Sequence, residues 1–512
     1  MLSWIKGSQS DHPLADDKAA RALLAELPAN DSCKALEELC YWLETLDHAE
    51  GMKLPRIVEL IDLIDQAAKG HHRKLSQDYL ESSARLQKFQ EARIWNAVFS
   101  FWKQLADAYQ MSLTRHQTDA DPWGSIKGQI PMIVARATRA LALQLKWELL
   151  RYGLVAPRVW EQFGRLYAYA EDKGFATVKV SVYPGMFGES MVQRELLKGL
   201  MLVISSTDSL LPHKIELVER VIAQFSEFFV LNRQPSKGCH YYVDLALGKP
   251  PVRMLSRLQM TPGLRFVGPG DAAPELEKLI AVVEADGVVP SNINLGGQFE
   301  RELVLQVLRH LARCWSRIPP ARAHERRHSV SQISVVHSFD EIVSTVSGKS
   351  QDRALGTSTE TWTLENESEG GFGALLPGTG ADWPKVGTLL GVKLEGGAAW
   401  GVGIVRRISA FDEKQRYVGI EVLARGAMVV KLMPVGATSG AAAQDAVLLL
   451  SDSHEIIEAS EMKLLLRIGG FSTQKSFEMR AYERGYLLVP RELVEAGEDF
   501  DMASFRLMQR GT

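Results

Sequence analysis

The stretch between Trp315 and His328 concentrates cations that could bind an anionic ligand. It contains Arg322-Ala-His-Glu-Arg326, an RxxxR pattern that closely follows two consecutive prolines. Five arginines fall within residues 313–328, against a single acid, Glu325. Arginine stays charged at every physiological pH, forms bidentate hydrogen bonds to phosphates and base edges, and stacks on flat rings. The stretch is therefore a candidate site for an anion that also carries aromatic rings.

A second pattern, NxSxxG, runs from Asn366 through Ser368 to Gly371. It ends an alternating run in which Trp362 and Leu364 are the apolar residues, and this alternation predicts a β-strand. Asparagine and serine side chains can hydrogen-bond base edges, and a glycine lets the backbone approach a ligand closely or adopt a positive φ. The strand would thus supply polar groups that complement the arginines.

The two motifs, in this order and followed by β-patterned sequence, resemble the ligand-binding signature of the PilZ domain, a bacterial β-barrel that binds the second messenger cyclic di-GMP. The resemblance covers about residues 317–430. It implies that the ligand-binding residues are Arg322, Arg326, Asn366, Ser368 and Gly371. In that family the arginine motif lies on a flexible segment before the barrel and clamps the ligand against the NxSxxG strand.

Alternatives to this assignment remain open at the level of sequence. Arg327 adjoins Arg326 and could take its part, and Arg317 is a further candidate for a guanine or phosphate contact. A basic connector after a helix is also typical of a solvated linker, and a segment rich in Asn and Gly is typical of an ordinary turn. Between the motifs, Ser338 to Glu341 forms a capping-box pattern, which predicts a helix that PilZ domains do not usually have there.

Composition and charge indicate a globular protein with several domains. The chain has 512 residues, 46% of them hydrophobic and 24% charged, with a formal net charge of −3. This length exceeds what one hydrophobic core supports, and about three domains are expected. No global basic field favours a nucleic acid partner, so any anion site must be local.

The sequence also predicts a reducing, cytoplasmic location. No apolar stretch is long enough to cross a bilayer, and the N-terminus lacks the apolar core of a signal peptide, so residues 1–16 are expected to be a flexible leader. The cysteines are scattered. Cys33 and Cys40 are spaced to lie two turns apart on one helix face, which is too far for a disulfide. Buried thiols of this kind fit a reducing compartment.

Residues 17–316 are predicted to form a mainly helical partner-binding or output domain, either a bundle or an irregular helical-repeat region. Apolar residues recur at helical spacing in two segments, at Ile57, Leu60, Ile61, Ile64 and Ala68, and at Ile130, Val134, Ala137, Leu141 and Leu145. Residues 72–109 are expected to be one long helix or a broken pair. An amphipathic helix over 299–315 ends before the two prolines, so the arginine motif would lie on a hinge.

From Ser331 onward the pattern changes to short strands punctuated by glycines. Residues 317–435 are predicted to form the PilZ-like antiparallel β-barrel. Residues 436–444 read as a Gly/Ala/Ser linker, and 436–512 as a small β domain, which is either a second barrel or an extension of the first. The expected fold class is therefore a multidomain α+β protein.

No signature of catalysis is present. The sequence has no Walker loop, HExxH, GxSxG, CxxC or GxGxxG pattern. The pair His71-His72 is expected to be solvent-exposed, and Cys239-His240 has no visible third partner for a catalytic site. We therefore expect no enzyme activity, no catalytic residue, no metal and no cofactor.

The predicted function is that of a cyclic di-GMP receptor that relays the signal through the hinge to the helical domain and a protein partner. The resemblance implies bacterial motility, attachment or polysaccharide control as the output. Nucleic acid binding and a transmembrane segment are not expected. The alternative is a scaffold protein whose PilZ-like barrel has lost its ligand site.

Overall fold

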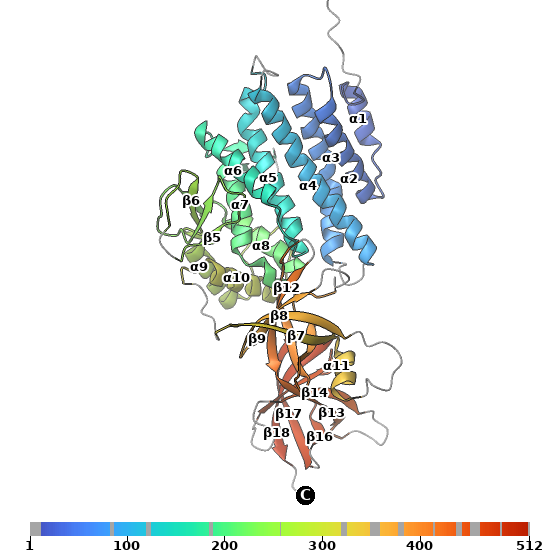
Figure 1. Cartoon of the computed structure of the whole chain (residues 1–512). Helices are drawn as coiled ribbons and strands as arrows, with labels where there is room; N and C mark the ends of the chain where they lie inside the picture. Colours follow the sequence, from blue (N-terminus) through green and yellow to red (C-terminus); the bar gives the residue numbers. More distant parts are fainter. Residues whose placement is uncertain are drawn as a thin grey trace, which may run out of the picture. The chain divides into compact units, whose positions relative to one another are not determined.

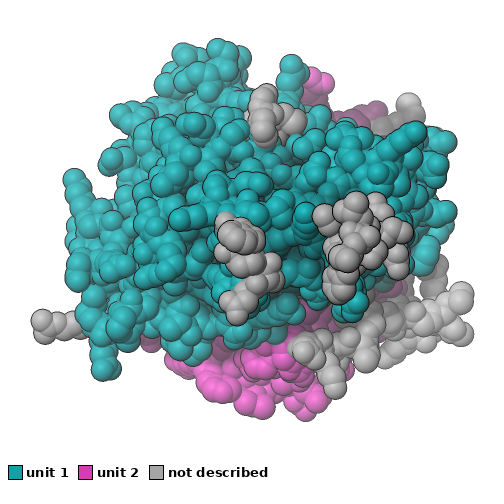
Figure 2. All heavy atoms as spheres, turned by 90° about the horizontal axis from the view of Figure 1, so that it is seen from above, with its two compact units in different colours: residues 1–207, 211–320 teal, residues 208–210, 321–512 magenta. Residues whose placement is uncertain are grey.

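A computed structural model describes the chain in segments. They are residues 12–81, 87–118, 124–183, 188–255, 258–318, 325–348, 359–376, 383–412, 415–436, 443–450, 461–481 and 484–509. The chain divides into two compact units, which Figure 2 distinguishes by colour. Unit 1 contains residues 1–207 and 211–320, and unit 2 contains residues 208–210 and 321–512.

Unit 1 is mainly helical, as predicted, and its long helices pack side by side (Figure 1). The helices are α1 Asp17–Ala25, α2 Ser32–Thr45, α3 Leu54–Glu81, α4 Lys88–Gln117, α5 Ile130–Leu150, α6 Pro157–Asp172, α7 Val192–Ile204, α8 Pro212–Phe225, α9 Ala272–Asp286 and α10 Arg301–Trp315. The periodic residues expected on α3 and α5 are all buried. Among the described residues, no helix is both long and apolar enough to cross a membrane.

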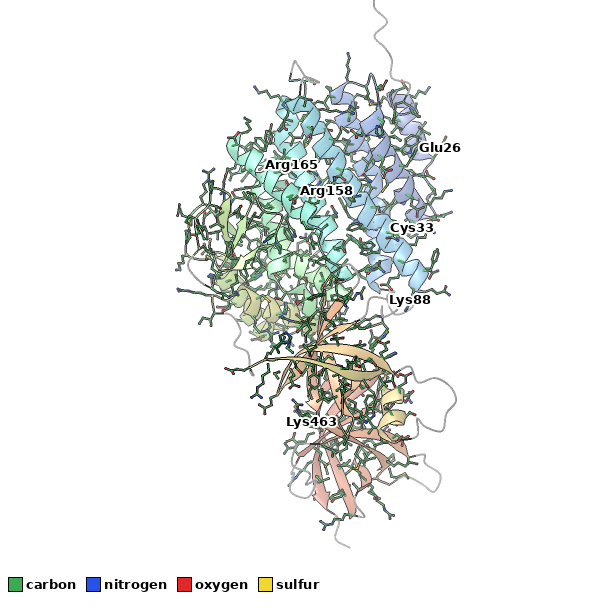
Figure 3. All side chains as sticks on the ribbon, in the orientation of Figure 1. Glu26, Cys33, Lys88, Arg158, Arg165 and Lys463 are labelled. Atoms are coloured by element: carbon green, nitrogen blue, oxygen red, sulfur yellow. The ribbon has the colours of Figure 1, made fainter. Side chains whose placement is uncertain are left out.

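Polar side chains join the helices of unit 1 as well. Inside the bundle, the Arg136 guanidinium of α5 donates hydrogen bonds to Asp62 of α3 and to the Tyr109 hydroxyl of α4. On the surface, Arg158 and Arg165 project from α6 (Figure 3) and reach Asp107 and Gln110 of α4. These contacts hold neighbouring helices together, because each one joins side chains of two different helices.

The histidine pair on α3 differs from the sequence expectation. His71 Nδ1 lies 3.2 Å from the Ser32 hydroxyl, and His72 Nε2 accepts a hydrogen bond of 2.8 Å from the Trp102 indole N–H. Burial lowers the pKa of His72 to about 3, so the ring is neutral at physiological pH. The expected exposure of both histidines was wrong: they are half-buried, because α2 packs against His71 and α4 against His72.

Short strands complete unit 1. One antiparallel sheet has the order β3 Val230–Asn232, β6 Leu264–Gly268, β4 Tyr241–Asp244, β5 Val252–Arg253, and β1 Val180–Ser181 pairs with β2 Glu189–Ser190. Strand β6 is buried along its whole length and therefore shows no two-residue alternation. Two or three residues, the length of β1, β2, β3 and β5, are too few to show a periodicity.

The first part of unit 2 is a closed six-stranded antiparallel barrel, with neighbouring strands in the order β10-β11-β12-β9-β8-β7. Its strands are β7 Arg327–His337, β8 Glu360–Ser368, β9 Gly371–Leu376, β10 Leu389–Leu394, β11 Gly401–Ala410 and β12 Arg416–Ala424. Helix α11, Phe339–Val346, follows β7, and the Ser338 side chain accepts a hydrogen bond from the Glu341 amide. The helix predicted from the capping-box pattern is therefore confirmed.

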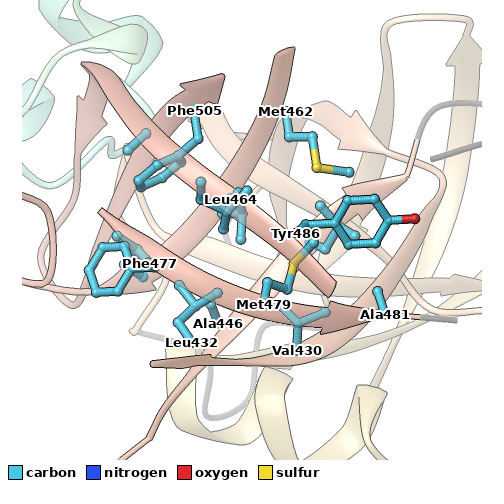
Figure 4. Packing of buried hydrophobic residues seen from close by; sticks show 14 residues of the cluster. Val430, Leu432, Ala446, Met462, Leu464, Phe477, Met479, Ala481, Tyr486 and Phe505 are labelled. Atoms are coloured by element: carbon cyan, nitrogen blue, oxygen red, sulfur yellow. The ribbon is translucent and has the colours of Figure 1, made fainter. Parts of the chain in front are cut away.

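A second closed barrel follows, with the order β13-β14-β15-β18-β17-β16. Its strands are β13 Gly426–Pro434, β14 Gln444–Leu450, β15 Glu461–Arg467, β16 Phe477–Ala481, β17 Arg484–Ala496 and β18 Phe500–Gln509. If β7 is matched to β13 and each later strand to its counterpart, the two barrels have the same strand order. Large apolar side chains such as Leu464, Phe477 and Phe505 fill the core of the second barrel (Figure 4).

Strand β13 corrects the boundary drawn from sequence, which placed residues 426–434 in the PilZ-like segment. This strand pairs with β14 and β16 of the second barrel. Only Arg425 separates it from β12, so no turn or linker pattern marks the transition. The Gly/Ala/Ser stretch that resembled a linker instead connects β13 to β14, and residues 437–442 of it lie outside the described residues.

The two barrels of unit 2 share an apolar cluster and an ion-pair network. Buried residues from both barrels and from α11 form the cluster, including Phe339, Ile404 and Phe500. The Arg406 guanidinium donates to both carboxylate oxygens of Glu495, at 2.6 and 2.7 Å. The predicted fold class, a multidomain α+β protein with a helical region and β-barrels, is confirmed.

Candidate ligand-binding site

The predicted site residues fall in different parts of the chain. Asn366, Ser368 and Gly371 lie on β8 and β9 of the first barrel, Arg327 is the first residue of β7, and Arg326 immediately precedes that strand. Arg317 belongs to unit 1, and Arg322 lies outside the described residues. Among the described residues, Arg326 is the arginine of the RxxxR motif that approaches the NxSxxG strand.

Arg326 and Asn366 meet at a residue that the sequence analysis did not identify, Tyr417 of β12. Arg326 Nη1 donates a hydrogen bond of 3.1 Å to the Tyr417 hydroxyl oxygen. Asn366 Nδ2 donates to the same oxygen at 2.9 Å. One arginine of the RxxxR motif and the asparagine of the NxSxxG motif thus share a single hydroxyl group.

The other amide atom of Asn366, Oδ1, is buried and has no hydrogen-bond partner among the described residues. If the amide were turned over, its oxygen would face the tyrosine hydroxyl and its nitrogen would take the position without a partner. In either orientation one buried polar atom of this amide has no hydrogen-bond partner among the described residues. Such an atom costs about 1–3 kcal/mol, and because solvent does not reach it, a ligand could pair with it only after the side chain turns outward.

A β-bulge decides which face of the strand Asn366 occupies. Leu364 pairs with Ala374, and both are fully buried inside the barrel. The pairing then shifts, so that Asn366 is opposite Gly373 instead of continuing the alternation. Paired residues of a sheet point to the same face, so Asn366 shares the outer face with Gly373. A second register shift, between β7 and β8, lies at the same point.

Gly373 leaves the space that Tyr417 and Asn366 use. A Cβ atom at this position would lie 2.0 Å from the Tyr417 hydroxyl oxygen and 2.7 Å from both polar atoms of the Asn366 side chain. Any side chain at residue 373 would therefore displace the hydroxyl group. Gly371 also permits a close approach, since a Cβ there would lie 2.3 Å from the backbone oxygen of Ile420.

Ser368 closes the hairpin between β8 and β9 and also contacts an arginine outside both motifs, Arg425. Its hydroxyl donates to the Gly371 carbonyl at 3.2 Å. Its own carbonyl accepts a hydrogen bond of 3.1 Å from Arg425 Nη2. The Arg425 guanidinium also lies over the Phe372 ring, 5.7 Å from its centroid. Arg425 thus lies against the motif hairpin, although it follows β12 in the sequence.

The remaining predicted arginines have different surroundings. Arg327 is exposed and is opposite Glu367 in the β7–β8 ladder. Arg317 is exposed, and its carbonyl accepts a hydrogen bond from Arg253 of β5. The same Arg253 guanidinium donates to the carbonyls of Cys314 and Ser316, so it caps the C-terminus of α10.

Two family models match the chain. A model described as "Cyclic-di-GMP receptor FimW, N-terminal domain" covers residues 18–236, and one described as "Cyclic-di-GMP receptor FimW, middle PilZ domain" covers residues 338–428. No curated protein matches the chain. The chain belongs to the FimW family of cyclic di-GMP receptors.

Membership of the FimW family confirms the PilZ assignment and extends it. The PilZ match begins at residue 338, within the segment of about 317–430 that the motifs indicated, and it includes β8, β9 and β12. The helical match shows that unit 1 also carries a family-specific sequence, which periodicity alone did not reveal. The FimW family is a family of cyclic di-GMP receptors.

Three residues at the candidate site were missed from sequence. Tyr417, Gly373 and Arg425 lie outside both motifs; Tyr417 lies on β12, and Arg425 directly follows that strand. The only local signal was the glycine spacing Gly371-x-Gly373, which indicates close approach at two positions on one face of a strand. Neither Tyr417 nor Arg425 is distinguished by type or spacing from other residues of the β-patterned region.

Proposed function

We propose that the first barrel binds cyclic di-GMP through Arg322 and Arg326 of the RxxxR segment and through Asn366, Ser368 and Gly371 of the β8–β9 hairpin. Arg327 and Arg317 are further candidates for the arginine contacts. The observation that carries this proposal is the convergence of Arg326 and Asn366 on the Tyr417 hydroxyl. It links the two motifs through one contact, although they come from separate parts of the chain.

The chemistry of the ligand fits these side chains. Each guanine offers N7 and O6 acceptors that match a bidentate guanidinium. The two phosphates favour further charge-assisted hydrogen bonds. If the Asn366 side chain turns outward on binding, its amide can accept from, or donate to, a base edge, and its buried atom gains the partner that it lacks. The Tyr417 hydroxyl orients both Arg326 and Asn366, so less conformational freedom remains to be lost on binding.

Titration of the fragment 317–512 with cyclic di-GMP tests this proposal. This fragment contains the RxxxR segment and both barrels, whose cores are formed within unit 2. We expect saturable heat in isothermal titration at micromolar ligand. Absence of any saturable signal at tens of micromolar, in the fragment and in the full chain, would instead favour a scaffold with a decayed site.

We further propose that ligand binding is relayed to the helical unit through the segment that follows α10. Arg253 hydrogen-bonds the carbonyls of Cys314, Ser316 and Arg317, so the start of this segment is tied to β5. Drawing Arg322 and Arg326 onto a ligand would restrict the residues between them and α10. A ligand shifts such an equilibrium only by binding two states with different affinity.

Hydrogen exchange over residues 312–330, with and without cyclic di-GMP, tests the relay. We expect slower exchange in this segment when the ligand is bound. Protection confined to the strand around Ser368 would show binding without transmission through the hinge. An Arg253→Ala variant should exchange faster at residues 314–317 in both states, because its carbonyl contacts are lost.

The cellular setting follows from the family and from composition. We propose a cytoplasmic receptor without catalytic activity, whose helical unit binds a protein partner. None of the four cysteines, all of which the structure describes, forms a disulfide, which fits a reducing compartment. Motility, attachment or polysaccharide control is the output that the PilZ resemblance implies. Pull-down with unit 1 as bait, in the presence and absence of cyclic di-GMP, would test for the partner.

A further inference from the structure

Arg425 occupies an unusual position in unit 2, because it is the single residue between the first and second barrels. Strand β12 ends at Ala424 and β13 begins at Gly426. The Arg425 side chain nevertheless turns back onto the first barrel, where Nη2 donates to the Ser368 carbonyl at 3.1 Å. The guanidinium therefore lies beside the serine of the NxSxxG motif.

The β8–β9 hairpin needs cations from elsewhere to bind an anion. Glu365, Glu367 and Glu369 flank Asn366 and Ser368, and residues 360–376 contain no lysine, arginine or histidine. A ligand with two phosphates would meet repulsion from these carboxylates unless nearby cations offset it. Arg326 reaches Tyr417, and Arg425 reaches the hairpin itself.

Arg425 keeps the capacity to bind a ligand while it contacts Ser368. A guanidinium has five N–H donors in a planar fork, and the Ser368 carbonyl takes one of them. The side chain is exposed, and its position over the Phe372 ring restricts it to the edge of the hairpin. Among the described residues the guanidinium makes no other hydrogen bond, so its remaining N–H donors form a pre-positioned fork that suits a phosphate.

We propose that Arg425 is a further ligand-contacting residue of the dinucleotide site and binds a phosphate of cyclic di-GMP. This inference rests on the proposed function of the first barrel. It has a consequence for the fold, since a ligand bound to Arg425 would also fix the residue that joins the barrels. The second barrel would then be restrained by the ligand without contacting it.

A series of substitutions in the full chain tests this role. With cyclic di-GMP in isothermal titration, Arg425→Ala and Arg425→Gln should each raise the dissociation constant about tenfold, and Arg425→Lys should raise it less, because the charge is kept. Arg480→Ala is the matched control, an exposed arginine on β16 of the second barrel. Thermal unfolding of each variant checks that the barrels are intact.

The glutamine variant separates ligand contact from a structural role. Glutamine can still donate to the Ser368 carbonyl but carries no charge, so wild-type affinity for Arg425→Gln would overturn the inference. A dissociation constant of Arg425→Ala within twofold of the wild-type value would also overturn it. In both cases the wild-type chain still binds cyclic di-GMP, so the proposed function would stand. If the wild-type chain gives no titration, the proposed function fails, and this inference fails with it.

Hydrogen exchange supplies an independent measurement. In the wild-type chain, bound cyclic di-GMP should slow exchange at residues 424–428 as well as around Ser368. In Arg425→Ala, at ligand concentrations that saturate it, protection should remain around Ser368 and be lost at 424–428. Equal protection at 424–428 in both proteins would contradict the contact.

Discussion

The two barrels of unit 2 share one topology but differ on their outer faces. Both are closed, six-stranded and antiparallel with the same strand order. In the first, β8 ends in the polar motif, and its outer face carries Asn366 beside Gly373. In the second, the counterpart of β8 is β14, which ends in three leucines, Leu448 to Leu450. The same arrangement of strands is therefore compatible with a polar ligand site or with none.

The interiors of the two barrels, in contrast, are alike, because buried apolar side chains fill both. Trp362 and Leu364 fill the first barrel, and Leu464 and Phe505 fill the second, all completely buried. Burial of such side chains stabilises each by about 1.5–3 kcal/mol relative to exposure. Apolar alternation thus specifies a barrel, whereas the proposed ligand site depends on a few outer-face residues of the first barrel. Substitutions on the two barrels can test this division.

The largest effect on binding is expected from Arg326→Ala. A charge-assisted hydrogen bond contributes about 1.5–3 kcal/mol, so the dissociation constant for cyclic di-GMP should rise by about tenfold or more. Arg326→Lys should restore only part of the affinity, because lysine lacks the planar fork. Arg480→Ala on the second barrel should bind like wild type. Equal affinities for Arg326→Ala and wild type would show that Arg327 or Arg317 makes the contact.

A smaller loss is expected from Gly373→Ala. The new methyl group would displace the Tyr417 hydroxyl and disturb its hydrogen bonds with Arg326 and Asn366, which should weaken binding about fivefold, or roughly 1 kcal/mol. Gly485→Ala on β17 is the matched control, since a Cβ there meets nothing within 4 Å. Titration of both variants, with circular dichroism to check the fold, gives the comparison. Equal affinity would mean that the Tyr417 contact is dispensable.

Tyr417→Phe should raise the dissociation constant for cyclic di-GMP by a smaller factor, about threefold, because the substitution removes one hydroxyl group and keeps the ring. The loss should not add to that of Gly373→Ala, since both changes act on the same hydrogen bonds. Titration of the double variant measures this coupling. Full additivity would indicate that Gly373 acts on the ligand site by another route.

The smallest effect on binding is expected from Arg406→Ala, which alters the contact between the barrels. Arg406 hydrogen-bonds Glu421 at 2.6 Å and both carboxylate oxygens of Glu495. These ion pairs are partly exposed. Their loss should therefore lower the free energy of unfolding by about 1 kcal/mol and the melting temperature by about 2–4 °C. The dissociation constant should change less than twofold. A large loss of affinity would show that the packing of the barrels controls the site.

Much of the architecture was accessible from the sequence for a simple physical reason. Helical periodicity on α3 and α5, the cap at Ser338 and the alternation at Trp362 and Leu364 are local patterns that burial and hydrogen bonding impose on neighbouring residues. The two motifs also indicated the PilZ domain. The β12–β13 junction was misplaced, because a strand that continues into the next barrel after one residue leaves no turn pattern.

The tertiary structure alone determined which residues lie together on the outer face of the first barrel. Read from sequence, the alternation Trp362, Leu364, Asn366 would place the asparagine inside the barrel with the apolar residues. The bulge after Leu364 reverses this, because the extra residue turns Asn366 outward toward Tyr417. Strand pairing across the closed barrel brings β12 beside β9, and with it Tyr417 and Arg425. Local sequence fixes periodicity and burial, but which distant strands become neighbours depends on how the whole sheet closes.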